Sequence, residues 1–121
     1  MAPRRLSLSQ ARRMTLAAQG FNVARPKRVT RQHLLKLMKR INLIQLDSVP
    51  VIIRTQYMPG FSRLGPYRAE LLDEVAYRDD KWFEAWSHEA TLVPVETEPW
   101  LRWNKARNEA GETWRVLRRL S

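Results

Sequence analysis

The sequence predicts an α+β domain that is mainly helical, with a terminal β-hairpin and a basic helix after it. Three observations support this class: apolar residues recur at helical intervals in three segments, two strand-like segments lie three residues apart, and a long basic segment follows them. A chain of 121 residues fits one domain, and a domain of that length buries roughly two-thirds of its unfolded surface.

The first helix is expected over residues 8–19. Ser7 and Gln10 have the spacing of a capping box, and Gly20 stands where a helix would stop. The apolar positions of this segment are Leu8, Ala11, Met14 and Ala18.

A second helix is expected after a polar connection over residues 22–29, with Thr30 as its N-cap. Its apolar positions are Leu34, Leu35, Leu37, Met38 and Ile41. The remaining face carries the basic residues Arg31, Lys36, Lys39 and Arg40, so this helix is expected to be amphipathic and basic. His33 is expected to be a surface or packing residue of the same helix.

Residues 43–47 alternate in polarity and predict a brief strand. Ser48 with Pro50 predicts a helical turn that runs towards Tyr57, because proline is tolerated in the first turn of a helix. The pairs Pro59-Gly60 and Gly65-Pro66 predict a loop between them.

A third helix is expected over residues 67–77, on the apolar positions Leu71, Leu72, Val75 and Ala76. The segments 82–86 and 90–95 are typical of strands, and Ser87-His88-Glu89 between them has the length of a hairpin turn. Helices followed by a terminal hairpin indicate a winged helix-turn-helix domain, which we assign to residues 1–98.

Residues 99–121 are expected to form a basic helix that begins after Pro99. The segment ends at Ser121 without a helix stop signal, which suggests the start of a further region.

The charge distribution predicts a polyanionic partner. The formal net charge is +10 and the sequence pI is about 11.0. Residues 1–46 carry eleven Lys and Arg and no acid, and the first carboxylate is Asp47. Double-stranded DNA is therefore the expected partner, and the candidate phosphate contacts are Arg12, Arg13, Arg31, Lys36, Lys39, Arg40, Arg54 and Arg63.

Several classes of protein are excluded by composition. The chain has no cysteine, which excludes disulfides and metal sites built on thiolates, and we expect neither a metal nor a cofactor. No apolar run is long enough for a membrane span, and the N-terminus lacks the apolar stretch of a secretory signal. We therefore expect a cytoplasmic protein.

Several blocks, in this order, resemble the AlkZ/YcaQ family of winged-helix DNA glycosylases. They are Leu8-Ser9-Gln10-Ala11-Arg12-Arg13-Met14, Ala17-Ala18-Gln19-Gly20-Phe21, Gln45-Leu46-Asp47-Ser48-Val49, Phe61-Ser62-Arg63-Leu64-Gly65 with Tyr67, and Glu84-Ala85-Trp86-Ser87-His88-Glu89-Ala90 with Leu92-Val93-Pro94. The resemblance covers roughly residues 6–103. Family members are bacterial repair enzymes of tandem winged-helix domains, much longer than this chain, which excise N7-alkylated purines and unhook interstrand crosslinks without a metal. The resemblance implies the same partner and chemistry here.

The family's active-site motif is Gln, an apolar residue, then Asp or Gln, and it falls on Gln45, Leu46 and Asp47. The resemblance therefore implies that Asp47 is the catalytic carboxylate, in the form of the YcaQ-like branch. A carboxylate suits this reaction because it stabilises the positive charge that develops on the sugar and orients the attacking water. Gln45 lies on the same side of a strand and is expected to hold that water or the sugar-phosphate.

Other roles for these residues stay open at this point. Asp47 is also a competent N-cap for a turn that begins near Ser48. His88 is a possible general base, although a local hydrogen bond in the hairpin is an equally simple role. The residues Trp82, Trp86, Trp100 and Trp103 are candidates for stacking on unpaired bases, but core packing is the more frequent use of such tryptophans. The alternative function is a winged-helix DNA-binding protein without catalysis, either a transcription regulator or a truncated remnant.

Overall fold

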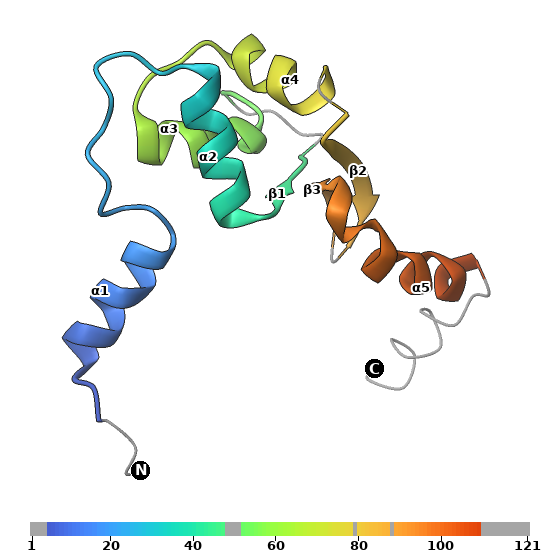
Figure 1. Cartoon of the computed structure of the whole chain (residues 1–121), viewed down its shortest axis with the longest axis horizontal. Helices are drawn as coiled ribbons and strands as arrows, with labels where there is room; N and C mark the ends of the chain where they lie inside the picture. Colours follow the sequence, from blue (N-terminus) through green and yellow to red (C-terminus); the bar gives the residue numbers. More distant parts are fainter. Residues whose placement is uncertain (1–4, 48–51, 79, 88, 110–121) are drawn as a thin grey trace.

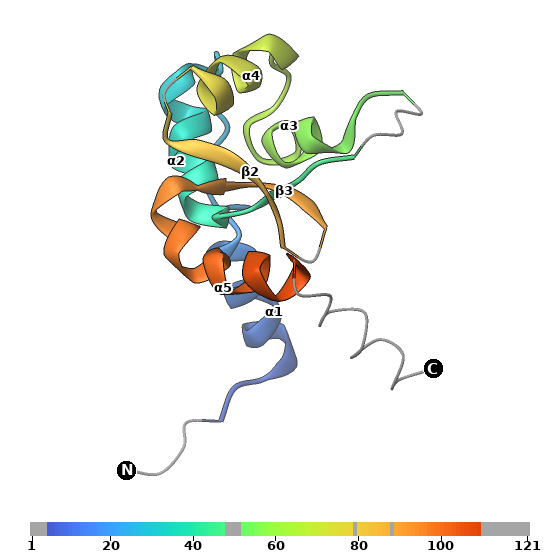
Figure 2. The same cartoon turned by 90° about the vertical axis from the view of Figure 1, so that its right-hand side faces the viewer.

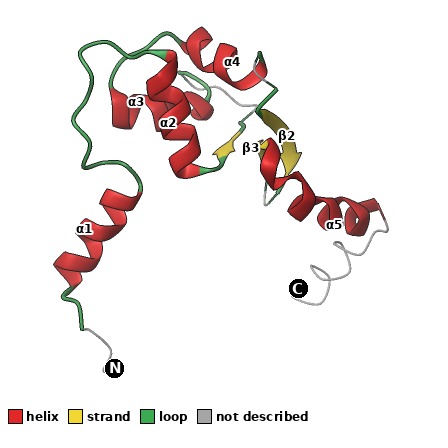
Figure 3. Cartoon of the chain, viewed as in Figure 1, coloured by secondary structure: helices red, strands yellow, loops and turns green. Residues whose placement is uncertain are grey.

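The computed structural model describes residues 5–47, 52–78, 80–87 and 89–109, and it confirms the predicted α+β, mainly helical class (Figures 1 and 3). In chain order the elements are α1 (Leu8–Ala18), α2 (Arg31–Ile41), β1 (Ile44–Gln45), the 3-10 turn η1 (Thr55–Tyr57), α3 (Met58–Leu64), α4 (Ala69–Tyr77), β2 (Trp82–Trp86), β3 (Ala90–Pro94), the 3-10 turn η2 (Val95–Thr97) and α5 (Glu98–Glu109).

The segment from α2 to β3 has the order helix, strand, helix, helix, strand, strand. Its three strands form one antiparallel sheet in the order β1-β3-β2. Helices α3 and α4 follow each other through a short turn, as the two helices of a helix-turn-helix do. This arrangement is consistent with a winged-helix-like fold. In Figure 2 the hairpin of β2 and β3 lies between α4 above and α5 below.

The hydrophobic core lies where α2, α4 and the sheet meet. Leu34 and Met38 of α2, Val75 of α4 and Leu92 of β3 are all at most 1% exposed. Burying a side chain of this size contributes roughly 1.5–3 kcal/mol, so this contact holds the domain together. Ile44 of β1 belongs to the same cluster, which fixes β1 against the core.

The helix starts follow from their caps. The Ser7 backbone N–H donates to Gln10 Oε1 (2.8 Å) and the Gln10 N–H donates to Ser7 Oγ (3.2 Å), which confirms the predicted capping box. At α2 the Thr30 N–H donates to His33 Nδ1 (3.1 Å). His33 therefore does more than occupy the helix surface, because it helps to start the basic helix.

The prediction of a loop between Pro59-Gly60 and Gly65-Pro66 is wrong, because residues 58–64 form α3. Pro59 lies in the first turn of α3, where it removes no helical hydrogen bond. Gly60 is buried under the ring of Tyr67, and a Cβ added there would lie 2.6 Å from the Tyr67 hydroxyl. This glycine therefore serves a close packing contact and does not mark a turn.

The predicted helical turn towards Tyr57 is only partly described. Residues 48–51 lie outside the described part, residues 52–54 are not helical, and the single 3-10 turn η1 follows. The strands of the hairpin match the prediction closely, with β3 ending at Pro94, one residue before the predicted end. Helix α5 begins at Glu98, so that Pro99 lies within its first turn.

Helix α1 stands apart from the core and contributes no buried residue (Figure 1). Its attachment is at its C-terminal end. Gly20, with φ of 87°, is buried against the side chain of Arg40, and Arg63 from α3 donates from Nε to the Gln19 carbonyl oxygen (2.6 Å). Among the described residues, α1 is therefore attached through the segment directly after it, which holds Gln19 and Gly20.

Candidate active site

The predicted catalytic triplet begins at the last residue of the short strand β1, Gln45, and ends two residues later at Asp47. Ile44 pairs with Leu92 and Gln45 with Thr91, and the Leu46 N–H donates to the Ala90 carbonyl oxygen (2.7 Å). Ile44 is buried and Gln45 is exposed. Leu46 packs against the core, which continues the alternation of the strand. Asp47 is half-buried and lies two residues after the end of β1, so its position on the same side as Gln45 stays a prediction.

The sheet register brings this triplet beside the turn of the hairpin. Ala90, which accepts from Leu46, is the first residue of β3. In the turn before it, the Ser87 N–H donates to the Glu89 carbonyl oxygen (3.0 Å). His88 lies within this turn but outside the described residues. The structure therefore joins two sequence blocks that lie far apart in the chain, residues 45–47 and 84–90.

A residue that the sequence analysis missed lies next to β1. Gln56 belongs to η1, which contacts β1, and its side chain is only 7% exposed. Its Oε1 has no hydrogen-bond partner among the described residues. A buried acceptor of this kind costs about 1–3 kcal/mol when unpaired. The sequence gives no signal for Gln56, because it follows two other polar residues, Arg54 and Thr55.

The basic residues predicted to contact phosphate lie in several parts of the structure. Arg12 and Arg13 are exposed on α1, Lys36, Lys39 and Arg40 are exposed on α2, and Arg54 is exposed before η1. Arg31 is half-buried at the start of α2. The residues around Arg40 also line a cavity of about 320 Å³ between α2, α3 and the loop after α1, whose charged or titratable members are His33, Lys36, Arg40 and Arg63.

The guanidinium of Arg63 is engaged by several groups of the fold. Besides its bond to Gln19, it donates to the Pro59 carbonyl oxygen (3.3 Å) and to Ser62 Oγ (3.1 Å), and it lies 4.2 Å from the ring centre of Phe21. Burial lowers its pKa from the usual value for arginine. The geometry gives Arg63 a structural role in holding α1, beside any contact with phosphate.

Helix α4, the second helix of the helix-turn-helix, carries Glu70, Asp73 and Glu74 and no Lys or Arg. In DNA-binding helix-turn-helix proteins this second helix enters the major groove. A row of carboxylates there repels phosphate. Asp73 has a structural role, because its carboxylate accepts from the Tyr57 hydroxyl (3.0 and 3.2 Å).

Two further tyrosines have raised pKa values near α4. Burial and the bond from its hydroxyl to Glu84 Oε1 (2.7 Å) raise the pKa of Tyr77 to about 12. Burial also raises the pKa of Tyr67, whose hydroxyl donates to the Tyr57 carbonyl oxygen (2.8 Å). A tyrosine is protonated at neutral pH in any case, and the raised pKa values extend the range of pH over which these two hydroxyls donate.

The described residues contain no cluster of three or more His, Asp or Glu side chains that would hold a metal ion. Within the same part of the chain no helix is long and apolar enough to cross a membrane.

Comparison with known proteins gives one family and no structure. No solved structure matches the chain. The sequence model of the family described as DNA glycosylase AlkZ-like matches residues 38–121, a stretch that contains the Gln45-Leu46-Asp47 triplet, the helix-turn-helix and the hairpin. This match confirms the resemblance on which the triplet was identified. The chain belongs to the AlkZ-like family of DNA glycosylases, and its partner is DNA.

Proposed function

We propose that this chain carries the active-site segment of a monofunctional DNA glycosylase that hydrolyses the N-glycosidic bond of N7-alkylated purines, including crosslinked ones. The observation that carries the proposal is the placement of Asp47. It is the first acid of a strongly basic N-terminal half, and it follows Gln45 at the end of β1, beside the hairpin turn. Residues 1–98 serve as the DNA-binding domain in this proposal.

The chemistry needs little more than one carboxylate. An N7-alkylguanine is cationic and is already a good leaving group, so no strong general acid is required. As the bond to the base breaks, positive charge develops on the sugar, and a carboxylate beneath it stabilises that charge. Two unit charges about 4 Å apart at an effective dielectric constant of about 20 gain roughly 4 kcal/mol, which corresponds to about a thousandfold in rate.

Each of the remaining residues has a supporting role in the proposal. The exposed amide of Gln45 holds the attacking water or the sugar-phosphate next to Asp47. The exposed cations of α1, α2 and Arg54 bind the phosphate backbone. His88, which lies outside the described residues, keeps the role of candidate proton acceptor that the sequence analysis gave it.

The acidic helix α4 argues against the transcription-regulator alternative. A regulator of the helix-turn-helix type contacts base edges through the second helix, and Glu70 and Glu74 on that helix would face phosphates on entry to a groove. The charge distribution is better suited to a protein that meets DNA through α2 and the region around β1.

The test uses duplex DNA with a single N7-alkylguanine and scores abasic sites. Asp47→Asn is the informative variant, because asparagine caps a helix as well as aspartate does but carries no charge. We expect Asp47→Asn, in this chain and in a version extended at its C-terminus, to bind the duplex undiminished and to lose excision by about a hundredfold to a thousandfold.

The matched control is Asp80→Asn, an exposed aspartate that precedes β2, at the opposite end of the hairpin from the triplet. It should leave the excision rate unchanged. Excision at the normal rate by Asp47→Asn would remove Asp47 from the mechanism. Sequence-selective binding of undamaged DNA without base release would favour the regulator.

A further inference from the structure

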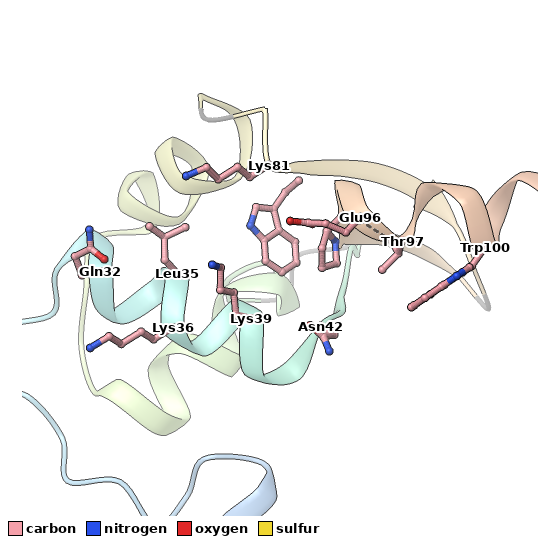
Figure 4. A pocket seen from close by; sticks show the side chains of 11 residues that line it. Gln32, Leu35, Lys36, Lys39, Asn42, Lys81, Glu96, Thr97 and Trp100 are labelled. Carbon is pink, nitrogen blue, oxygen red and sulfur yellow. Dashed lines mark hydrogen bonds between the residues drawn. The ribbon is translucent and has the colours of Figure 1, made fainter.

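A groove separates α2 from the segment that joins the hairpin to α5 (Figure 4). Its volume is about 780 Å³. On one side it is lined by residues of α2 and its C-cap that recur every three or four positions, namely Gln32, Leu35, Lys36, Lys39 and Asn42. On the other side it is lined by Lys81, Trp82, Pro94, Glu96, Thr97 and Trp100. The groove is therefore built between two segments far apart in sequence.

Positive charge dominates the rim of this groove. Lys36 and Lys39 extend from α2, and Lys81 comes from the opposite side (Figure 4). All three lysines are exposed, and none forms an ion pair or side-chain hydrogen bond with another described residue. Glu96 is the only carboxylate among the described residues that line the groove. The excess of cations suits an anionic occupant with several charges.

Trp100 supplies an aromatic surface at one end of the groove. It lies in the first turn of α5 and is 72% exposed, which is unusual for an indole. Trp82, in contrast, is 7% exposed and belongs to the core, so it forms part of the floor. A positively charged groove with an exposed aromatic ring is the arrangement that binds single-stranded nucleic acid, through phosphates on the cations and a base stacked on the ring.

We propose that this groove binds a short unpaired segment of a DNA strand, with phosphates on Lys36, Lys39 and Lys81 and one base stacked on Trp100. A volume of about 780 Å³ lies in the range of pockets that hold a drug-sized ligand, so the groove suits a few nucleotides and is too small for a duplex. The choice of DNA as the strand rests on the family, and the link to base excision rests on the proposed function.

The position of the groove relative to the triplet fits a strand that flanks the damaged nucleotide. Asn42 lines the groove, and Asp47 follows it five residues later. Five residues of fully extended chain are at most about 18 Å long, so the two residues are no farther apart than that. A strand that occupies the groove therefore lies within a few nucleotides of Asp47. Opening of the duplex next to the lesion, which base extrusion requires, would supply such an unpaired segment.

Fluorescence anisotropy with a labelled oligothymidylate and with a labelled blunt duplex tests the stacking contact. We expect Trp100→Ala to weaken binding of the oligothymidylate by about tenfold and binding of the duplex by less than threefold, and Trp100→Phe to restore most of the loss. The control is Phe61→Ala on α3, which removes an exposed aromatic residue outside the groove. Equal losses for Trp100→Ala and Phe61→Ala would overturn the proposal.

The lysines are tested by two variants that remove the same charge. The triple variant Lys36→Gln, Lys39→Gln, Lys81→Gln should weaken oligothymidylate binding at least tenfold more than Lys27→Gln, Arg68→Gln, Arg78→Gln, whose three residues are exposed and lie outside the groove. Glu96→Gln should strengthen it. Equal losses for the two triple variants would show that the charges act diffusely and would overturn the proposal.

The outcome is separate from that of the excision assay, because binding of the oligothymidylate needs no catalysis. Loss of excision by all versions of the chain together with binding that depends on Trp100 would overturn the proposed function and retain the groove. Normal excision, with oligothymidylate binding that is insensitive to Trp100 and to the three lysines, would retain the proposed function and overturn the groove proposal. Circular dichroism and thermal unfolding establish that each variant is folded.

Discussion

Helices α2 and α4 pack against each other in the core, and they carry opposite charge. Leu34 and Met38 of α2 lie with Val75 of α4 in one apolar cluster, so both helices contribute to the core. On their outer faces, however, α2 carries only basic charges and α4 only acidic ones. We therefore infer the DNA-facing surface of this chain from charge, and not from the position of a helix in the helix-turn-helix, because phosphate contacts supply most of the non-specific affinity.

The two helices also differ in what their charged residues contact. Lys36 and Lys39 on α2 form no ion pair or side-chain hydrogen bond with another described residue and line the groove. Asp73 on α4 accepts from the Tyr57 hydroxyl, and Glu84 on the neighbouring β2 accepts from the Tyr77 hydroxyl. The basic face is thus available for a ligand, whereas the carboxylates on and beside α4 partly serve the fold.

The largest expected effect is the difference in affinity for duplex DNA between a variant that removes the charges of α2 and one that removes the charges of α4. The variant Lys36→Gln, Lys39→Gln, Arg40→Gln should weaken binding of undamaged duplex at least tenfold at low salt. It should also reduce the slope of log K against log salt by about 0.9 for each phosphate that the variant no longer neutralises. The variant Glu70→Gln, Glu74→Gln should change affinity by less than threefold, and in the direction of tighter binding. A large drop in affinity for the α4 variant would place DNA on α4 and reverse the comparison.

An effect of intermediate size is expected for Arg63. This residue is basic like those of α2, but its guanidinium contacts other groups of the fold, so its removal should change stability more than binding. Arg63→Gln should weaken the attachment of α1 by about 1–2 kcal/mol, since it removes a charged donor from Gln19 and a cation from Phe21. Amide hydrogen exchange of residues 16–23 measures this weakening. Arg78→Gln, at an exposed position directly after α4, is the control with the same change of charge. Unchanged exchange in Arg63→Gln, with a lower salt slope instead, would show that Arg63 belongs with the phosphate contacts.

Tyr77, the last residue of α4, gives the smallest effect, which appears only at high pH. Because the pKa of Tyr77 is raised to about 12 in the folded protein, the folded state holds its proton more tightly than the unfolded chain does. The stabilisation is complete below pH 10, the ordinary value for tyrosine, and is lost as the pH rises through about 12. The free energy of unfolding should therefore decline over this interval, and Tyr77→Phe should decline less.

Spectroscopic titration of the tyrosinate absorbance separates the causes of this pKa. Glu84→Gln removes the charge that faces the Tyr77 hydroxyl and should lower the pKa, while burial keeps it above 10. Glu89→Gln, an exposed residue of the hairpin turn, is the control and should leave the titration unchanged. An unchanged titration in Glu84→Gln would assign the whole shift to burial.

The sequence by itself determined the elements whose signals are local. The capping box at Ser7, the N-cap at Thr30 and the apolar periodicity of α2 and α4 act within one or two helical turns, and the hairpin needs only two strands and a short turn. It also determined the charge of the N-terminal half, and it identified a candidate triplet that lies within the stretch matched by the family model.

Only the tertiary structure decided what depends on distant partners. Helix α3 is hidden in the sequence because Pro59 and Gly60 resemble turn residues until Tyr67 is seen to cover the glycine. The pairing of β1 with β3 places Leu46 beside Ala90, and no local pattern encodes that register. The role of Arg63 in holding α1, and the groove between α2 and Trp100, likewise arise from segments that meet only after folding. Periodicity and capping act between neighbours in the chain, whereas packing, pairing and grooves join residues that the chain separates.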